Sequence, residues 1–271
     1  MLLVEGRAGS GKSTLMQHVR TTAVRRADTH TVMTSFFHRQ GSSLQRTQLG
    51  FLQSLLHQIL DVGGECIAEF VRDTNFERRC RLEGKPGVDW KWSEDEMQRQ
   101  LAKQLQHHSK ARRIWLYVDA IDESDHRKDV LECMKMLASD GAINISICIS
   151  TRPVPRVRWA GALVISVEKE NRDDIEHFVF QELQKNADSF RFADGQLVME
   201  HLVRRASGVF KWAALVLRRI VDHLADESTK RMLQEIDDLP RELADVYQHT
   251  LRQLSGVDQE MALWHCDLPS G

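Results

Sequence analysis

The sequence predicts an α/β fold in which helices cover both faces of a parallel sheet, followed by an all-helical region. Five short apolar runs rich in β-branched residues alternate with helical patterns over the first 168 residues, an order typical of parallel sheets. After residue 168 only helical patterns continue. The chain has 271 residues, of which 42% are hydrophobic and 28% charged, so it can form one or two globular domains.

The five apolar runs are the expected strands, and they lie at Leu2–Val4, Thr31–Phe37, Ile114–Val118, Ile143–Ile149 and Leu163–Val167. Helical periodicity appears after the first strand and over residues 44–59, 92–108 and 125–138. Ser93 and Glu96 have the spacing of a capping box, so a helix is expected to begin there. The segment Asn75–Val88 holds two glycines and a proline among charged residues, which predicts a surface loop.

Helices are expected in the second region over residues 171–185, 194–206, 209–225, 229–236 and 240–254. The run Asp237-Asp238-Leu239-Pro240 breaks the helical pattern, and it predicts that Pro240 lies in the first turn of the next helix. We therefore expect a first domain over residues 1–168, a helical domain over residues 169–238 and a further segment over residues 239–271.

The residues from Gly6 to Thr14 read GRAGSGKST and lie between an expected strand and an expected helix. They match G-x-x-x-x-G-K-[ST], the P-loop signature, in the strand–loop–helix context that this signature requires. Gly6, Gly9 and Gly11 allow backbone conformations in which consecutive N–H groups, including that of Ser10, point at phosphate oxygens. The sequence therefore predicts binding of a nucleoside triphosphate.

The residues at the end of this signature supply charge and a metal ligand. The helix that begins near Lys12 adds its unpaired N–H groups and the positive end of its dipole. Lys12 is expected to reach the β- and γ-phosphates, Ser13 to offer its hydroxyl to Mg²⁺, and Thr14 to contact the α-phosphate. Ser13 is thus one of two expected magnesium ligands.

The second signature is the apolar strand Ile114–Val118, which ends in Asp119 and is followed by Ala120-Ile121-Asp122-Glu123. This is the Walker B arrangement, in which Asp119 holds a magnesium-bound water. Asp122 or Glu123, one turn further, is expected to act as the base that accepts a hydrogen bond from the attacking water. An acidic helix start is the alternative interpretation of these two residues.

A third candidate follows the strand Ile143–Ile149, where the sequence reads Ser150-Thr151-Arg152-Pro153. A polar residue and an arginine at the end of a strand beside the P-loop strand are expected to face the γ-phosphate. Arg152 would then report whether that phosphate is present. The alternative is an arginine in an ordinary turn.

Other classes of function are disfavoured. GTPases have D-x-x-G after the Walker B strand, whereas Asp119 is followed by Ala-Ile-Asp, and no N-K-x-D motif occurs. Neither a substrate acid near the P-loop nor a lid arginine cluster indicates a small-molecule kinase. Formal net charge is -2 and the arginine pairs are scattered, which indicates no nucleic-acid partner. The five cysteines and twelve histidines show no zinc spacing. With neither a signal peptide nor a membrane-spanning stretch, we expect a cytoplasmic protein without a membrane partner.

Six segments together resemble the fungal NACHT-type NTPases, also described as nephrocystin-3-like N-terminal domains, within the STAND class of signal-transducing P-loop ATPases. These segments are VEGRAGSGKSTLM, SFFHRQGSSLQRTQLGFLQSLLHQIL, LYVDAIDES, ICISTRP, ASGVFKWAALVLRRI and LPRELADVYQHTL. The resemblance implies a five-strand parallel sheet of order 5-1-4-3-2, then a helical domain and a winged-helix domain that begins near Pro240. The chain ends at Gly271, so residues 239–271 are expected to form only the start of a winged helix.

The resemblance implies a role for each matching residue. Lys12 and Ser13 match the Walker A pair, and Asp119 matches the acid that holds magnesium. Glu123 matches the catalytic acid, and Arg152 matches the sensor arginine. It places Gly208 where the helical domain turns toward the adenine base. The expected function is an ATP/ADP switch with slow hydrolysis in defence or incompatibility signalling, and its partners would be related NACHT chains. The alternative is a truncated interaction protein that binds nucleotide weakly, without catalysis, and pairs with full-length relatives.

Overall fold

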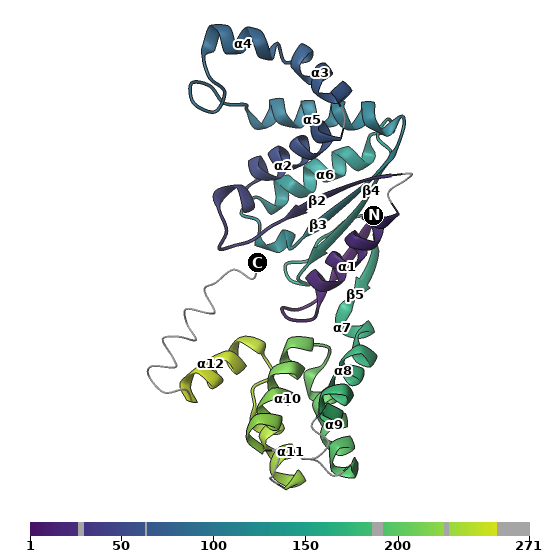
Figure 1. Ribbon diagram of the computed structural model, residues 1–271, viewed down its shortest axis with the longest axis vertical. Coiled ribbons are helices and arrows are strands. Elements are labelled where there is room, and N and C mark those ends of the chain that lie inside the picture. The colour runs from purple at the N-terminus through teal and green to yellow at the C-terminus, as the bar shows by residue number, and fades with distance from the viewer. Residues whose placement is uncertain (27–29, 63, 186–191, 225–227, 254–271) are drawn as a thin grey trace. The chain divides into compact units, whose positions relative to one another are not determined.

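The computed structural model describes residues 1–26, 30–62, 64–185, 192–224 and 228–253 (Figure 1). By their contacts these residues form two units. The sheet unit contains Met1–Glu5 and the described part of Lys12–Ile165, and the helical unit contains Gly6–Gly11 together with the described residues from Ser166 onward. The division after Ile165 lies three residues before the one expected from the sequence. The short loop from Gly6 to Gly11 packs with a part of the chain that follows it by about 160 residues.

The sheet has five strands, in the order β2-β3-β4-β1-β5. They are β1 (Leu2–Glu5), β2 (His30–Phe36), β3 (Arg113–Asp119), β4 (Ile145–Thr151) and β5 (Leu163–Ser166). Read from β5, this is the order that the resemblance implies. The pairs β1–β4, β2–β3 and β3–β4 are parallel.

The register of these pairs brings four strand ends to one edge of the sheet. Glu5 is opposite Thr151 across β1 and β4, and Phe36 is opposite Asp119 across β2 and β3. Because these strands are parallel, their carboxyl ends meet at this edge, which is where ligands bind in open α/β sheets. The P-loop signature follows β1, Asp119 is the last residue of β3, and Arg152 follows β4.

Helices cover both faces of the sheet (Figure 1). One face is covered by α1 (Lys12–Arg25), where Met16 packs against Cys148 of β4. The other face is covered by α2 (Gln48–Asp61), α5 (Glu94–Ser109) and α6 (Arg127–Ser139). The largest apolar core lies on this second face, and its fully buried members include Leu52, Leu55, Leu101, Ile114, Val118 and Val130. Helix α5 begins as the sequence predicts, because Ser93 and Glu96 form both bonds of a capping box.

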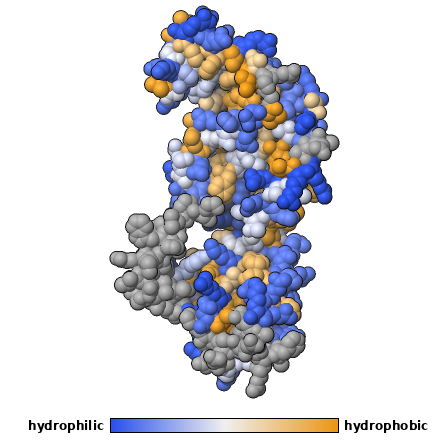
Figure 2. Space-filling view, viewed as in Figure 1, coloured by the Kyte–Doolittle hydropathy of each residue, from blue (hydrophilic) through white to orange (hydrophobic). Residues whose placement is uncertain are grey.

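The expected surface loop over Asn75–Val88 is wrong for most of its length. Helix α4 (Phe76–Glu83) follows α3 (Gly64–Asp73) and ends at Gly84, whose φ is +96°. The guanidinium of Arg79 lies 4.0 Å from the ring centroid of Trp90 and 4.8 Å from that of Trp92, and this cation–π contact holds α4 in place. The glycines and the proline indicate a loop, whereas the helix depends on the contacts of Arg79 with Trp90 and Trp92, which lie outside it. In Figure 2, hydrophobic patches alternate with hydrophilic ones over this end of the sheet unit.

The helical unit contains α7 (Val167–Glu170), α8 (Arg172–Lys185), α9 (Phe192–Ala206), α10 (Phe210–Leu224), α11 (Thr229–Asp238) and α12 (Leu243–Gln253). Its own apolar core includes Ile175, Val198, Trp212 and Ile236, all 0% exposed. A break between helices occurs as expected, but Asp237 and Asp238 still belong to α11, so it begins at Leu239. Helix α12 begins three residues after Pro240, so the proline is not in its first turn. The rest of the expected winged-helix segment, residues 254–271, lies outside the described residues. No helix among those described is both long and apolar enough to cross a membrane.

Candidate functional site

The loop that follows β1 has the backbone that an anion-binding loop needs. Gly9 and Gly11 have φ values of +76° and +103°, conformations that side chains with a Cβ rarely adopt. The N–H of Ser10 donates to the carbonyl oxygen of Arg7 at 3.2 Å, which closes a turn. A Cβ added at Gly11 would meet no atom within 4 Å, so open space lies beside the backbone there. These features fit the approach of a phosphate group to the loop.

The first residues of α1 follow this loop directly. Helix α1 begins at Lys12, whose side chain is half-buried, while Ser13 and Thr14 are exposed. The N–H groups of the first turn have no carbonyl partner within the helix, and they carry the positive end of its dipole. All three residues therefore lie at the N-terminal end of α1, and the N-terminal end of a helix favours an anion.

The Walker B acid is held by the neighbouring strand. Ser150 of β4 donates its hydroxyl hydrogen to Asp119 Oδ1, and its Oγ accepts the N–H of Ala120 at 2.9 Å. Ser150 is 0% exposed, so its hydroxyl is shielded from water, while both of its partners are partly buried. Sequence reasoning noted Ser150 only as a polar residue near a strand end. The signal that could have revealed its role is a buried serine beside an acid that ends the adjacent parallel strand.

Asp122 and Glu123 lie in the short 3₁₀ turn Ile121–Glu123, and both carboxylates contact Arg152. The Nε of Arg152 lies 3.1 Å from Asp122 Oδ2, and its backbone N–H donates to Asp122 Oδ1 at 3.0 Å. The Arg152 guanidinium is 3.7 Å from Glu123 Oε1, and Glu123 Oε2 accepts the N–H of Arg39 at 3.0 Å. The structure thus brings together the three residues for which the sequence predicts catalysis or sensing.

Ser150 provides a direct test of this arrangement. Replacing Ser150 with alanine leaves the Ala120 N–H without its partner and removes a donor from Asp119, so we expect a loss of about 1–3 kcal/mol in unfolding free energy. Thermal and urea unfolding of the full chain measure this loss, with Ser146→Ala on the same strand as the control. An S150A chain as stable as the S146A chain would mean that the two bonds contribute nothing.

Gly208 lies in a left-handed turn of the helical unit, with a φ of +80°. A Cβ at this position would lie 2.6 Å from the Cα of Glu168, so only glycine fits there. The Gly208 carbonyl oxygen accepts a hydrogen bond from the side chain of Asn171, which also donates to the carbonyl oxygen of Ser10 in the P-loop. Sequence reasoning missed both Asn171 and Glu168.

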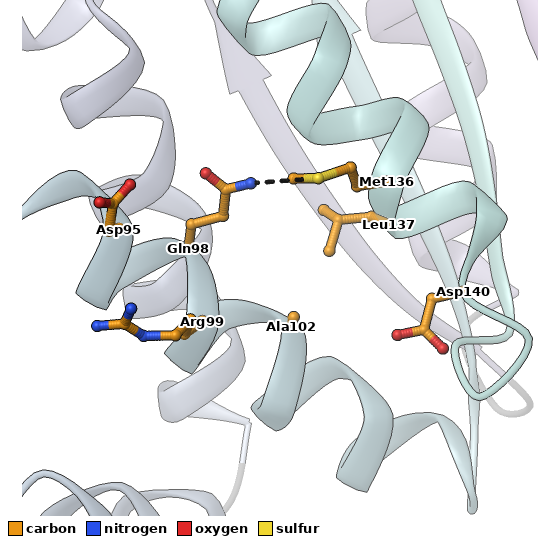
Figure 3. Close-up of a pocket in the computed structure, with 7 residues that line it drawn as sticks. All are labelled: Asp95, Gln98, Arg99, Ala102, Met136, Leu137 and Asp140. Atoms are coloured by element: carbon orange, nitrogen blue, oxygen red, sulfur yellow. Dashed lines mark hydrogen bonds between the residues drawn. The ribbon is translucent and has the colours of Figure 1, made fainter.

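Two further features lie outside this set of residues. A surface pocket of about 350 Å³ is formed by α5 and by the end of α6 (Figure 3), lined by Asp95, Gln98, Arg99, Ala102, Met136, Leu137 and Asp140. It contains none of the residues that the sequence predicts for the site.

Burial, and then the charge of Asp119, raise the pKa of the Cys148 thiol to about 11, so this thiol stays protonated near neutral pH. Within the described ranges, no three His, Cys, Asp or Glu side chains gather as a metal cluster.

Comparisons with known proteins give one family and a set of distant structural likenesses. The family model described as Nephrocystin 3, N-terminal matches residues 1–152, which is more than half of the chain. A search of curated proteins found no match.

Among solved structures, the chain is similar to the Aeropyrum pernix ORC1 protein in complex with DNA (TM-score 0.44, 12% identity, 94% of this chain and 63% of that one). It is also similar to Drosophila ORC bound to DNA (TM-score 0.45, 13% identity, 94% and 62%). A third similar structure is C. elegans PCH-2 (TM-score 0.42, 8% identity, 92% and 60%). The chain therefore spans less than two thirds of each of these structures.

Proposed function

Because this chain belongs to the nephrocystin 3 N-terminal family, we propose that it is an ATP-binding switch module that hydrolyses ATP slowly. The observation that carries the proposal is the grouping of charged residues at the carboxyl edge of the sheet. Asp122 and Glu123 there pair with Arg152, and Asp119, the last residue of the neighbouring strand β3, is held by Ser150 of β4. The strand that leads into the P-loop signature is paired with β4, which carries Ser150 and precedes Arg152.

Nucleotide would be held by the loop from Gly6 to Gly11 and by the first turn of α1. In this assignment Lys12 and the loop N–H groups bind the phosphates, and Ser13 with Asp119 holds Mg²⁺. Magnesium in such sites is bound through one or two protein ligands together with phosphate oxygens, so a larger cluster of acids is not needed. When bound, this ion neutralises charge that develops on the phosphates.

The contacts of the two acids favour Glu123 over Asp122 as the base. The side chain of Asp122 is only 7% exposed; it accepts a hydrogen bond from the backbone N–H of Arg152 and forms an ion pair with the Arg152 guanidinium. The Glu123 side chain is 26% exposed, and its closest contact with the guanidinium is longer, at 3.7 Å. Asp122 therefore positions Arg152, while Glu123 has better access to water. Arg152 would exchange this acid pair for the γ-phosphate when ATP is bound.

The finer assignment follows from the resemblance of the six sequence segments. We propose a NACHT-type switch of fungal signalling, in which ATP and ADP favour different arrangements of the helical segment. Such a switch would gate association with related chains. Gly208 and the residues that surround it belong to the segment that responds.

One observation favours a second candidate function, a nucleotide-binding interaction protein without turnover. Both oxygens of Glu123 have partners, Arg39 and Arg152, which would hold the carboxylate away from an attacking water. In that case nucleotide would stabilise the fold, and pairing with relatives would be the function. This candidate predicts binding of MgATP and MgADP with no hydrolysis.

Calorimetry of MgATP and MgADP with the 271-residue chain, and single-turnover hydrolysis, test the two candidates. We expect binding of both nucleotides and hydrolysis on the order of 10⁻³ s⁻¹, as in P-loop hydrolases without a partner's arginine. Glu123→Gln should keep binding and slow hydrolysis about 100-fold, since a positioned base contributes at least that much. Glu132→Gln, on the exposed face of α6, is the control.

Each outcome separates the candidates. Binding with hydrolysis that depends on Glu123 supports the switch. Binding with no turnover in either the wild-type or the E123Q chain supports the interaction protein. Absence of nucleotide binding would contradict both.

A further inference from the structure

The carbonyl groups of the P-loop need partners on the side opposite the phosphate. In an anion-binding loop, successive N–H groups converge on the anion, so the carbonyl oxygens of the same peptides face away from it. Buried carbonyl oxygens must find donors, or they lose a hydrogen bond that water would otherwise supply. Ser10 is only 2% exposed, so its backbone depends on donors within the protein.

The helical unit supplies these donors. The Nδ2 of Asn171 donates to the carbonyl oxygen of Ser10 at 2.9 Å, and also to that of Gly208 at 2.9 Å. The N–H of Lys211, in the first turn of α10, donates to the carbonyl oxygen of Gly9 at 2.9 Å. A first-turn N–H has no partner in its own helix, so the loop carbonyl satisfies it.

A second attachment lies at the start of the loop. Glu168 of α7 accepts hydrogen bonds from the Nε of Arg7, at 3.0 Å, and from its backbone N–H. The same arginine donates from its guanidinium to the carbonyl oxygen of Ser207 at 2.7 Å. Arg7 therefore joins the beginning of the loop to the turn Ser207–Val209.

These contacts leave the loop little room to move away from the turn. A Cβ at Gly9 would lie 2.9 Å from the Cβ of Lys211 and 2.8 Å from a methyl carbon of Leu243. Asn171 is 6% exposed, and its amide cannot be reversed, because its nitrogen must donate to two carbonyl oxygens. Its own Oδ1 has no partner among the described residues, so the two donated bonds are what this side chain contributes.

We propose that Asn171 is a positioning residue for the phosphate-binding loop, and that its amide couples this loop to the turn Ser207–Val209. One amide nitrogen holds both peptides, so a change in the Ser10 peptide on nucleotide binding reaches Gly208 through a single side chain. The coupling to nucleotide rests on the proposed function, whereas the positioning of the loop does not. Asn171 lies outside the stretch that matches the family model.

Asn171→Asp removes the donor while keeping the shape of the side chain, and it places a carboxylate oxygen against two carbonyl oxygens. Hydrogen exchange without nucleotide, followed by mass spectrometry, measures the result. The reporting amides are those of Arg7, Ser10 and Lys211, since each is hydrogen-bonded in this arrangement. We expect their exchange to be about tenfold faster in the variant. Asn171→Ser, which is too short to reach both carbonyl oxygens, replaces N171D if that chain does not fold.

The control separates positioning from general loss of stability. Val179→Ala removes methyl groups from a fully buried position of α8 without touching the loop contacts. It should accelerate exchange in α8 and leave the peptides covering residues 6–11 and 207–211 as in the wild type. Two results would overturn the proposal. One is that hydrogen exchange of these two peptides is accelerated equally in V179A and N171D. The other is that their exchange in N171D is the same as in the wild type.

A second comparison adds MgADP as the probe. In the wild-type chain MgADP should protect residues 6–14 and also residues 207–211, whereas in N171D protection should stay within residues 6–14. Equal protection of residues 207–211 in both chains would overturn the coupling. If MgADP changes hydrogen exchange nowhere in the wild-type chain, the result would contradict both the proposed function and the coupling. The comparison without nucleotide decides separately whether Asn171 positions the loop.

Discussion

Replacing Lys12 with alanine is expected to weaken MgATP binding by about 100-fold. Lys12 is the first residue of α1, directly after the loop with left-handed glycines, so its ammonium group would lie beside the phosphates. A hydrogen bond between charged groups is worth up to about 3 kcal/mol, which is more than a factor of 100 in affinity. Calorimetry with the wild-type and K12A chains measures the difference directly.

Two companion variants make this result specific. Lys135→Ala removes the same charge from an exposed position of α6 and should leave MgATP affinity unchanged. Lys12→Arg keeps the charge but replaces a compact ammonium by a planar fork, so it should restore only part of the affinity. If K12A binds MgATP as tightly as the wild type, the P-loop assignment is wrong.

Replacing Trp212 with alanine should destabilise the helical unit by about 3–5 kcal/mol, because a large aromatic side chain is removed from a closed core. Trp212 is 0% exposed, and its Nε1–H donates to the carbonyl oxygen of Pro240 at 2.7 Å. For a unit of about 100 residues, this loss corresponds to a fall in Tm on the order of 15 °C or more. Circular dichroism during heating, with hydrogen exchange of α8–α11, measures it.

The contributions of packing and hydrogen bonding at this position can be separated. Trp212→Phe keeps most of the apolar contact and loses the bond to Pro240, so it should cost less than the alanine variant. Leu197→Ala, at a position of α9 that is 53% exposed, should leave the Tm nearly unchanged. A W212A chain with the Tm of L197A would show that this core does not stabilise the helical unit.

The sequence predicts much of the fold because its signals are local. The start of α5 is an example, since Ser93 and Glu96 provide both halves of the cap within four residues. Helix α4 could not be predicted in this way. Its position depends on Arg79 stacking against Trp90 and Trp92, which follow it in sequence, and the nearby glycines and proline give the opposite local signal.

In the candidate site too, residues with a local sequence signal could be predicted, and residues whose partners are distant in sequence could not. The P-loop residues and Asp119 can be proposed from sequence because they lie at or directly after the ends of apolar strands, and parallel strands bring their ends together. The sequence predicts that Arg152 faces the γ-phosphate, and it does not predict the contacts of Arg152 with Asp122 and Glu123. Asn171 and Glu168 could not have been found, since they lie 161 residues from their P-loop partners and match no motif.

The grouping of Gly6–Gly11 with the helical unit has a consequence for how such chains evolve. The stretch that defines the family ends at residue 152, whereas the groups that hold the Gly9 and Ser10 carbonyl oxygens come from residues 171 and 211. A recombination event that exchanged everything after the family stretch would keep every signature residue and lose these donors. The residues that must be inherited together therefore include more than the signature. A chimera would need Asn171 and the turn Ser207–Val209 from the same parent as its P-loop glycines.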